Sequence, residues 1–451
     1  MAQVLTGFSS ISTEDVRRAE DRLRVRRTRQ NHSGWLRRLL LAWLLVGPGI
    51  LVMLGDNDAG GVLTYATTGA QFGLGFFLPF LLFLMTPLAY VVQEMTVRLG
   101  AVTGRGHAEL IWARFGRFWG WFSLTDLALG NLLTLVTEFI GMGTGLAFFG
   151  VPLQIGVPLS AAVVLGVAIF GRYWTAERLT LGLAGFNLVF VPVALLAHPD
   201  PIQVTKAFVS FSLPGGLTGA ALFLIIANIG TTIAPWMLFF QQSAVVDKGL
   251  TEQDIPHGRL DTAIGSIVMG IIAVAIVIAT GATLHPAGKN VSDLSQADFI
   301  RALVPFVGGT GARLFALGLF EAGLVAAITI NLSTSWAFGE VFGWAHSLNS
   351  RIHEAPWFYL LYIVSIVIAA ATVLVPGAPL ELITLMVQLV ATLLMPPALL
   401  FLLLLLNDRE LMGKWTNGRW ANCFSALIII ALLGLNASYG LTVLFPHLLP
   451  S

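Results

Sequence analysis

The sequence predicts an all-helical integral membrane protein of about eleven transmembrane helices, arranged as two inverted repeats of five helices and one additional helix. The first observation is composition. Of 451 residues, 56% are hydrophobic and 11% are charged, whereas soluble domains carry roughly a quarter charged residues. Second, many apolar runs reach the roughly 20 residues that a spanning helix needs. Third, the first and the sixth run contain helix-breaking residues at corresponding places.

The apolar runs are read as helices because a transmembrane barrel would instead show alternating segments of about 10 residues. The mean hydropathy of +0.82 supports the same reading. The expected spans cover residues 39–72, 75–98, 118–148, 153–171, 176–198, 218–246, 260–285, 312–344, 357–376, 380–406 and 421–446.

The segment before the first span, residues 1–38, is polar and rich in arginine. It lacks the short apolar stretch and cleavage site of a signal peptide, so we expect a cytoplasmic tail. The single cysteine, Cys423, excludes an intramolecular disulfide framework and a cysteine-based metal cluster.

The distribution of Lys and Arg predicts the orientation, because basic residues are enriched in cytoplasmic loops. With the N-terminus inside, all but four of the 25 Lys and Arg residues fall in the tail or in inner loops. The odd number of spans then places the C-terminus outside. We expect a multi-pass plasma-membrane protein whose outer basic residues are Lys206, Lys289, Arg301 and Arg313.

The first span is interrupted by the sequence GDNDAGG, residues 55–61, which sets two carboxylates, Asp56 and Asp58, among glycines. The sixth span is interrupted between Asn228 and Pro235, where Gly230 and the proline weaken the helix. Paired interruptions in two halves indicate an inverted-repeat transporter with its site at the midplane.

The pairing of the breaks divides the chain into a first repeat, 39–198, a second repeat, 218–406, and an additional span, 421–446. Unwound backbone within a membrane is tolerated only where it lines a cavity. Carbonyl oxygens beside carboxylates suit a cation, so the breaks predict a cation site.

Three other acids, Asp126, Glu138 and Glu321, lie within expected spans, and no Lys or Arg lies near a span centre. Each acid is therefore neutral, paired with a polar neighbour, or placed to meet a mobile cation. For Glu138 and Glu321 alone the structural reading is favoured. For Asp58 the functional reading is favoured because it lies in a break.

Several segments resemble the NRAMP family of divalent-metal transporters. GPGILVMLGDNDAGGVLTYATTGAQFG is similar to the family's first span, whose Asp-Pro-Gly-Asn motif falls on residues 58–61. RLGAVTGRGHAEL agrees in spacing with the loop after the second span, and IGTTIAPW is similar to the family's sixth-span segment. Gln388 lies eight residues before Pro396, as the family's site glutamine does. The resemblance implies a LeuT-like fold with broken helices 1 and 6.

The departures from the family's pattern remove side chains that the resemblance associates with metal or protons. Asp58 keeps the family's metal-binding aspartate, and Asp56 is an added acid. The family's asparagine, methionine, histidine and proton-route aspartate are replaced here by Gly61, Ala234, Trp236 and Leu135. This pattern resembles the magnesium-transporting, NRAMP-related branch.

The resemblance also implies further contributors to the site. Thr231 and Gly55 would offer carbonyls freed by the breaks, being three residues before Ala234 and Asp58. Gln388 would contact the ion's ligands or its bound water, or make only an interhelical hydrogen bond. Asp56 would face the ion or cap a half-helix, where an acid is also favourable.

These residues predict a secondary transporter that imports Mg²⁺ by alternating access, with Mn²⁺ as a further cargo. Loss of the thioether removes discrimination against hard cations, and Mg²⁺ is usually held by one or two carboxylates through a partial water shell. With Leu135 and Trp236 in place of titratable groups, we expect transport uncoupled from protons, although Glu138 is retained. We expect no cofactor, no nucleic-acid partner and no enzyme activity. The partners would be divalent cations and the bilayer, and the protein a monomer.

Three alternatives remain. The main one is a proton-coupled Mn²⁺ or Fe²⁺ carrier of the main NRAMP branch, against which Ala234 argues. An amino-acid carrier of the same fold would set a substrate carboxylate against Asp56 and Asp58. A membrane enzyme would need a nucleophile–base pair or a metal cluster, and the sequence shows neither.

Overall fold

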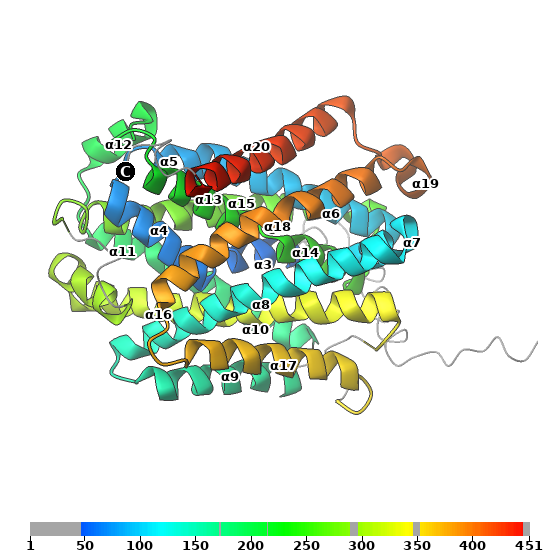
Figure 1. The fold of residues 1–451 in the computed structure, drawn as a ribbon, viewed down its shortest axis with the longest axis horizontal. Helices are drawn as coiled ribbons and strands as arrows, with labels where there is room; N and C mark the ends of the chain where they lie inside the picture. The colour runs from blue at the N-terminus through cyan, green and yellow to red at the C-terminus, as the bar shows by residue number, and fades with distance from the viewer. Residues whose placement is uncertain (1–46, 171–172, 214, 289–295, 346–351, 445–451) are drawn as a thin grey trace, which may run out of the picture.

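The structure is a computed structural model, and it describes residues 47–444 except 171–172, 214, 289–295 and 346–351. The predicted tail, residues 1–38, and the first residues of the first span therefore lie outside the described residues. Every described element is a helix, and the long helices α8, α9, α16 and α17 run side by side along the longest axis in Figure 1.

The described residues contain nine helices long and apolar enough to cross a membrane. A shorter apolar helix, Leu153–Ile169, and the interrupted first span bring the number to the eleven that the sequence predicts. The nine long segments are Phe77–Thr103, Arg117–Phe148, Arg178–Leu196, Gly219–Asp247, Glu252–Gly281, Asp298–Phe342, Pro356–Val373, Leu380–Leu406 and Arg419–Leu441.

Both predicted breaks are present. The first span consists of α3 (Pro48–Gly55) and α4 (Ala59–Phe72), and the sixth of α13 (Gly219–Thr232) and α14 (Pro235–Asp247). Pro48 and Pro235 each stand at the start of a half-helix, where a missing N–H costs nothing.

The remaining helices mostly follow the predicted spans. They are α5 (Phe77–Pro79), the π-helical η1 (Phe80–Met85), α6 (Thr86–Thr103), α7 (His107–Phe115), α8 (Arg117–Phe148), α9 (Leu153–Phe170), α10 (Tyr173–Ala184), η2 (Gly185–Val189), α11 (Phe190–Leu196), α12 (Pro201–Ser210), η3 (Glu252–Asp254), α15 (Ile255–Gly281), α16 (Gln296–Phe342), α17 (Pro356–Val373), α18 (Leu380–Leu406), α19 (Arg409–Met412), η5 (Gly413–Trp415) and α20 (Arg419–Leu444).

The eighth span is preceded by a helical stretch that the sequence did not predict, because α16 runs from Gln296. Gly308, with φ 71°, interrupts the helix. The stretch before it is too mixed in polarity to be read as a span. The short α12 was also missed, although Asp200 accepts a hydrogen bond from Ile202 N and Pro201 follows it, a typical helix start.

Small residues let neighbouring helices approach one another closely. A Cβ on Gly265 of α15 would lie 3.0 Å from the Gly49 carbonyl oxygen of α3. A Cβ on Gly145 of α8 would lie 2.6 Å from the Ala316 carbonyl oxygen of α16. Such close backbone contacts are typical of membrane helix packing, where dispersion replaces the hydrophobic effect between helices.

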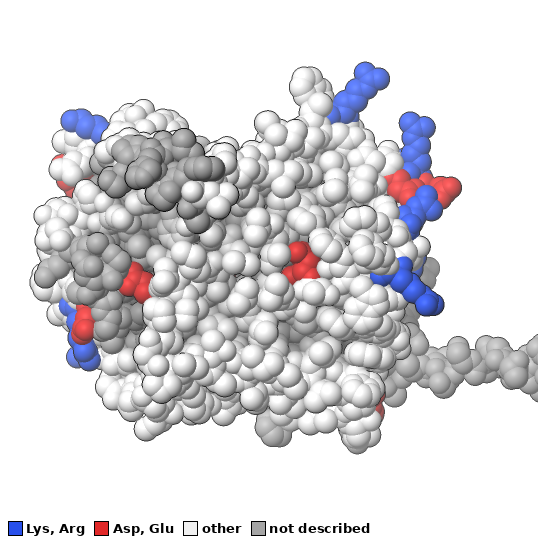
Figure 2. All heavy atoms as spheres, in the orientation of Figure 1, with Lys and Arg blue, Asp and Glu red and all other residues white. Residues whose placement is uncertain are grey.

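The charged residues on the visible face gather mainly at the two ends of the bundle, and most of the surface between them is uncharged (Figure 2). Large apolar side chains are exposed on the long helices, as for a surface that faces lipid; examples are Phe122 and Leu129 of α8 and Leu393 and Leu400 of α18. The end that carries α7 and α19 is called the basic end below.

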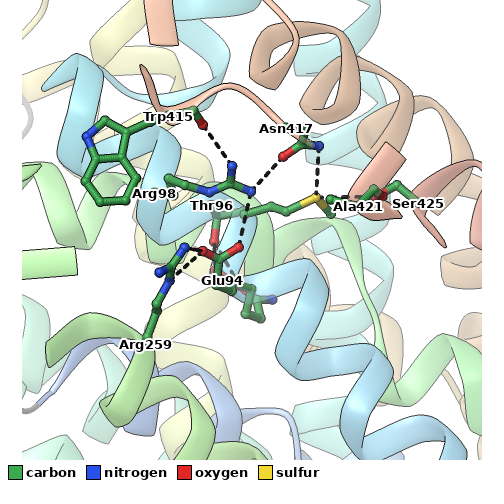
Figure 3. A network of polar contacts seen from close by, with 10 residues as sticks. Glu94, Thr96, Arg98, Arg259, Trp415, Asn417, Ala421 and Ser425 are labelled. Carbon is green, nitrogen blue, oxygen red and sulfur yellow. Dashed lines mark hydrogen bonds and ion pairs between the residues drawn. The ribbon is translucent and has the colours of Figure 1, made fainter. Parts of the chain in front are cut away.

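A polar network ties three segments together at the basic end (Figure 3). Glu94 of α6 pairs with Arg98 at 3.2 Å and with Arg259 of α15 at 2.7 Å. Arg98 also donates to the carbonyl oxygen of Trp415 and to Asn417 Oδ1, both before α20. Because Arg98 is buried and both of its terminal nitrogens are engaged, it fixes the last helix against the second span.

Candidate metal centre

Asp58 lies at the first break and begins the second half-helix. Its backbone is extended, and its Oδ1 accepts a hydrogen bond of 2.5 Å from Gly61 N. Asp58 is therefore the N-cap of α4. The capping contact that the sequence allowed for Asp56 is made instead by Asp58. Asp56 instead ends α3, with its backbone N–H bonded to the Val52 carbonyl oxygen at 3.0 Å.

The second break lies against the first. Ile233 and Ala234 are extended between α13 and α14. A Cβ on Gly61 would lie 2.5 Å from Thr231 Oγ1 and 3.1 Å from Asp58 Oδ1. Gly61 is therefore the close contact that brings Thr231 of one break beside Asp58 of the other.

Gln388 of α18 reaches the same place. A Cβ on Gly60 would overlap Gln388 Nε2, and a Cβ on Gly230 would overlap the Gln388 carbonyl oxygen. Thr392, one turn later, donates to the Ile226 carbonyl oxygen at 2.8 Å. The tenth span thus touches both breaks at glycines.

Glu138 of α8 supports the start of α4. Its Oε2 accepts from Ala59 N at 2.9 Å, and its Oε1 accepts from Thr137 Oγ1 at 3.0 Å. The Thr137 hydroxyl also lies 2.7 Å from the Thr134 carbonyl oxygen, so the secure donor to Glu138 is the backbone N–H of Ala59. Leu135, one turn earlier on α8, is buried.

Trp236 and Gly55 lie together on the side of the breaks toward the basic end. A Cβ on Gly55 would lie 3.5 Å from Trp236 Cη2. The Trp236 carbonyl oxygen accepts from Ser333 Oγ of α16 at 3.1 Å. An indole in this place closes off space and offers no group that titrates in the physiological range.

Several buried polar atoms near the breaks have no hydrogen-bond partner among the described residues. They are both carboxylate oxygens of Asp56, Thr231 Oγ1 and Gln388 Nε2. Buried polar atoms are normally satisfied by protein or by water. These atoms, from the first, sixth and tenth spans, are therefore available to hydrogen-bond water or a hydrated ion.

The acids outside the breaks, Asp126 and Glu321, do not contribute to the site. Asp126 is partly exposed and precedes Glu138 on α8 by 12 residues, which is roughly 18 Å along a helix. Glu321 is buried on α16, and neither of its oxygens has a partner in the described part of the chain. Neither acid joins the group formed by Asp58, Thr231 and Gln388.

Sequence reasoning missed two residues at the site. The Tyr65 hydroxyl lies 3.2 Å from Thr232 Oγ1 and ties α4 to the end of α13. Thr137 lies against Gly60, where a Cβ would be 2.8 Å from Thr137 Oγ1. Tyr65 could have been found, because it follows Asp58 by seven residues and so lies on the same face of α4.

Histidine was not expected to relay protons at the site. His107 is buried on α7, where burial lowers its pKa to about 4. Its imidazole is therefore neutral at physiological pH. It packs on Phe239 of α14 with ring centroids 4.8 Å apart.

Comparison with known proteins agrees with this architecture. The model of the natural resistance-associated macrophage protein-like (Nramp) family matches residues 49–442. The divalent metal cation transporter MntH of Erwinia tasmaniensis is 28% identical over 410 residues, which cover 88% of this chain and 94% of that protein. MntH of Klebsiella pneumoniae is 28% identical over 422 residues, covering 91% and 96%.

Solved structures show the fold. The Eremococcus coleocola manganese transporter, crystallised with an aromatic bis-isothiourea compound, superposes with a TM-score of 0.75 at 22% identity, covering 93% of this chain and 91% of that one. MhsT in complex with L-phenylalanine superposes with a TM-score of 0.59 at 13% identity, covering 86% and 98%. The predicted LeuT-like class with broken helices 1 and 6 is confirmed.

The relatives are membrane transporters rather than enzymes, and the metal is their substrate rather than a cofactor. The enzyme alternative is therefore set aside. With its matched region spanning nearly all of the described residues, this chain belongs to the Nramp family and is a multi-pass transporter of divalent metal cations.

Proposed function

We propose that the chain carries Mg²⁺, with Mn²⁺ as a second cargo, without obligatory proton coupling. The observation that supports this most is the pair of small residues at the breaks. Gly61 and Ala234 stand where the family has an amide and a thioether, so the sulfur that favours soft transition metals is missing.

The orphaned polar atoms support a partly hydrated ion. Mg²⁺ sheds water reluctantly and is usually bound through one or two carboxylates. Asp58 would be the direct carboxylate. Asp56 and Thr231 would accept hydrogen bonds from metal-bound water, and Gln388 would do so through whichever amide atom faces the ion. The described residues hold no group of three or more His, Cys, Asp or Glu arranged to bind a metal, so a stripped ion would find few ligands.

Two observations support uncoupled transport. The Ala59 N–H donates to Glu138 Oε2 and so holds the start of α4 against α8, and Leu135 and Trp236 offer no proton site. Uptake would then follow the membrane potential. This supplies about 2.3 kcal/mol per charge per 100 mV, and about twice that for a divalent ion.

The second candidate is a proton-coupled transition-metal carrier. The relatives carry the name divalent metal cation transporter, and the solved relative is called a manganese transporter. These names favour Mn²⁺, whereas the replaced residues of this chain favour Mg²⁺. The carboxylate that such coupling would use here is Glu138.

Flux measurements separate the two candidates. In proteoliposomes containing a Mg²⁺ indicator and a pH dye, we expect Mg²⁺ entry that increases with a negative-inside potential, with no matching acidification. Proton entry in proportion to metal entry would refute uncoupled transport. Entry of Mn²⁺ with no entry of Mg²⁺ would establish the transition-metal candidate. Liposomes without protein measure the background leak of ions and protons.

Replacing Ala234 by methionine tests the basis of the selectivity. The added thioether should raise the ratio of Mn²⁺ to Mg²⁺ uptake by at least about tenfold, equivalent to about 1.4 kcal/mol of added preference. Ala234→Leu adds similar bulk without sulfur and should not raise the ratio. Competition between the two ions in one flux assay measures it, and equal ratios in the two variants would refute a ligand position at 234.

A further inference from the structure

Gly60 and Gly61, at the start of α4, each make room for a polar side chain from another span. A Cβ on Gly60 would lie 2.8 Å from Thr137 Oγ1 of α8. A Cβ on Gly61 would lie 2.5 Å from Thr231 Oγ1 of α13 and 3.1 Å from Asp58 Oδ1. Two non-bonded atoms at 2.5 Å overlap. The Thr231 hydroxyl therefore occupies the place where a side chain at 61 would begin.

The Thr231 hydroxyl is not used within its own helix. A buried threonine in a helix commonly donates to the carbonyl oxygen four residues earlier. In this protein Thr64, Thr67 and Thr68 of α4 do so at 2.8 or 2.9 Å, and Thr232 does so at 2.7 Å. Thr231 is 2% exposed, yet its Oγ1 makes no hydrogen bond within the described residues. Its oxygen therefore remains available to a ligand held at the breaks.

Contacts on both sides of Thr231 hold the end of α13 in place. Thr232 Oγ1 lies 3.2 Å from the Tyr65 hydroxyl of α4. Gly230 packs directly on the Gln388 carbonyl oxygen of α18, with no room for a Cβ between them. The end of α13 therefore cannot move away from α4 without losing these contacts.

We propose that Gly61 and Thr231 form one specificity-determining pair. The Thr231 hydroxyl requires glycine at 61, and it supplies from the sixth span the polar side-chain atom that the family has at 61 in the first span. This rests on the proposed function, in which the same oxygen faces the water shell of the ion. The two positions have thus exchanged roles, and neither can be understood alone.

The exchange favours an ion that keeps its water. A hydroxyl accepts a hydrogen bond from metal-bound water and still has its own proton to donate. An asparagine amide at 61 would carry its oxygen one bond further from the backbone than the threonine hydroxyl does. It would therefore approach the ion more closely and displace water, which Mg²⁺ gives up reluctantly.

Substitutions at 231 test the hydroxyl. Thr231→Val keeps the shape of the side chain and removes the oxygen, whereas Thr231→Ser keeps the oxygen and removes the methyl group. We expect the initial Mg²⁺ flux into proteoliposomes to decrease about threefold to tenfold in Thr231→Val, as for one lost hydrogen bond. In Thr231→Ser it should stay within about twofold of the wild-type value.

Thr67→Val is the matched control for Thr231→Val. Thr67 is also buried, and its hydroxyl bonds within its own helix, to the Leu63 carbonyl oxygen at 2.9 Å. Its replacement should leave Mg²⁺ flux within about twofold of the wild-type value. Wild-type flux in Thr231→Val would overturn the role of the hydroxyl, as would an equal loss in Thr231→Ser or Thr67→Val.

Gly61→Ala tests whether the two positions depend on each other. The added methyl group forces the hydroxyl to turn away or α13 to move, so flux should decrease as much as in Thr231→Val. The melting temperature in detergent should also fall by several degrees, because the site is overpacked. Adding Thr231→Ala removes the overlap. The double variant should recover the melting temperature and lose no more flux than Thr231→Ala alone.

Gly61→Asn together with Thr231→Ala moves the polar atom back to the first span. We expect this double variant to raise the ratio of Mn²⁺ to Mg²⁺ uptake at least tenfold above the wild-type ratio. Gly61→Asn alone should transport either ion poorly, because Thr231 occupies the space that the new side chain needs. Elution of each variant as a folded protein in size exclusion is checked before its flux is measured.

The outcomes separate the pair from the choice of cargo. The melting temperatures of Gly61→Ala, Thr231→Ala and their double variant need no transported cation. If they show the recovery while Mg²⁺ uptake fails even in the wild type, the pair stands and the choice of cation is wrong. Flux losses that multiply in the double variant, with no recovery of the melting temperature, would overturn the pair. Equal uptake of Mn²⁺ by Gly61→Asn with and without Thr231→Ala would do the same.

Discussion

Asp58→Ala is expected to abolish uptake of divalent cations, with a loss of at least about 100-fold. Changing residues that only support a metal ligand typically costs 10–100-fold, and Asp58 is the carboxylate at the first break itself. It is 3% exposed and lies beside Thr231 of the second break. Removing its charge leaves a divalent ion without its principal counter-charge at the midplane, where ions are poorly solvated.

The alanine variant also removes the cap of α4, so a second variant must separate charge from structure. Asp58→Asn keeps a side-chain oxygen for Gly61 N, and asparagine caps helices about as well as aspartate. We expect Asp58→Asn to elute as a folded protein and to transport as poorly as Asp58→Ala. Flux near the wild-type value in the asparagine variant would show that Asp58 acts through its cap alone.

Asp56→Asn is the matched control for a neighbouring buried acid. Asp56 makes no side-chain hydrogen bond within the described residues, so its replacement removes no structural contact. Asp56 is proposed to contact the ion only through water. Asp56→Asn should therefore weaken uptake about tenfold or less, because losing a water-mediated contact costs less than losing a direct ligand. The difference between the two asparagine variants, measured as initial Mg²⁺ flux, gives their order of importance.

The fold could be predicted because its signals are local. Apolar runs and the interruptions at Asp58 and Pro235 are read from neighbouring residues, and these features reappear in α3, α4, α13 and α14. The long extension of α16 before residue 312 was missed because Gly308 and Pro305 signal an end there. The chain is in fact helical on both sides of Gly308, where α16 is kinked.

The site could be predicted only as a set of residues, because their contacts depend on long-range packing. That Gly61 lies against Thr231, or that Gln388 lies against Gly60, follows from how three spans meet. The residues next to Gly61 and Gln388 in the sequence do not predict these contacts. Capping by Asp58 rather than Asp56 depended on where the break ends, and helix ends are the least certain part of a sequence-based prediction.

The second large effect is expected from Asp261→Ala, because Asp261 holds the start of α3 against α15. Asp261 of α15 is buried, and its carboxylate accepts from Gly49 N at 2.7 Å and from Gly47 N at 3.3 Å. These N–H groups belong to the start of α3 and have no partner within that helix. Next to them, a Cβ on Gly49 would lie 2.7 Å from Thr262 N, so the two backbones are in direct contact.

Asp261→Ala leaves two buried N–H groups unsatisfied, at about 1–3 kcal/mol each. We expect the melting temperature in detergent, measured by fluorescence-detected size exclusion, to be several degrees lower. We also expect α3 to separate from α15 more easily. Asp261→Asn, which keeps one acceptor oxygen, should lose roughly half as much.

A thiol at Leu51 of α3, in the Cys423→Ser background, reports the release directly. Leu51 is 5% exposed, so labelling from the basic end should be slow in the parent and faster in Asp261→Ala. Because α3 carries the backbone that ends at Gly55, its release would also open the first break on that side. An unchanged melting temperature together with unchanged labelling would show that α3 is held by its glycine contacts and not by Asp261.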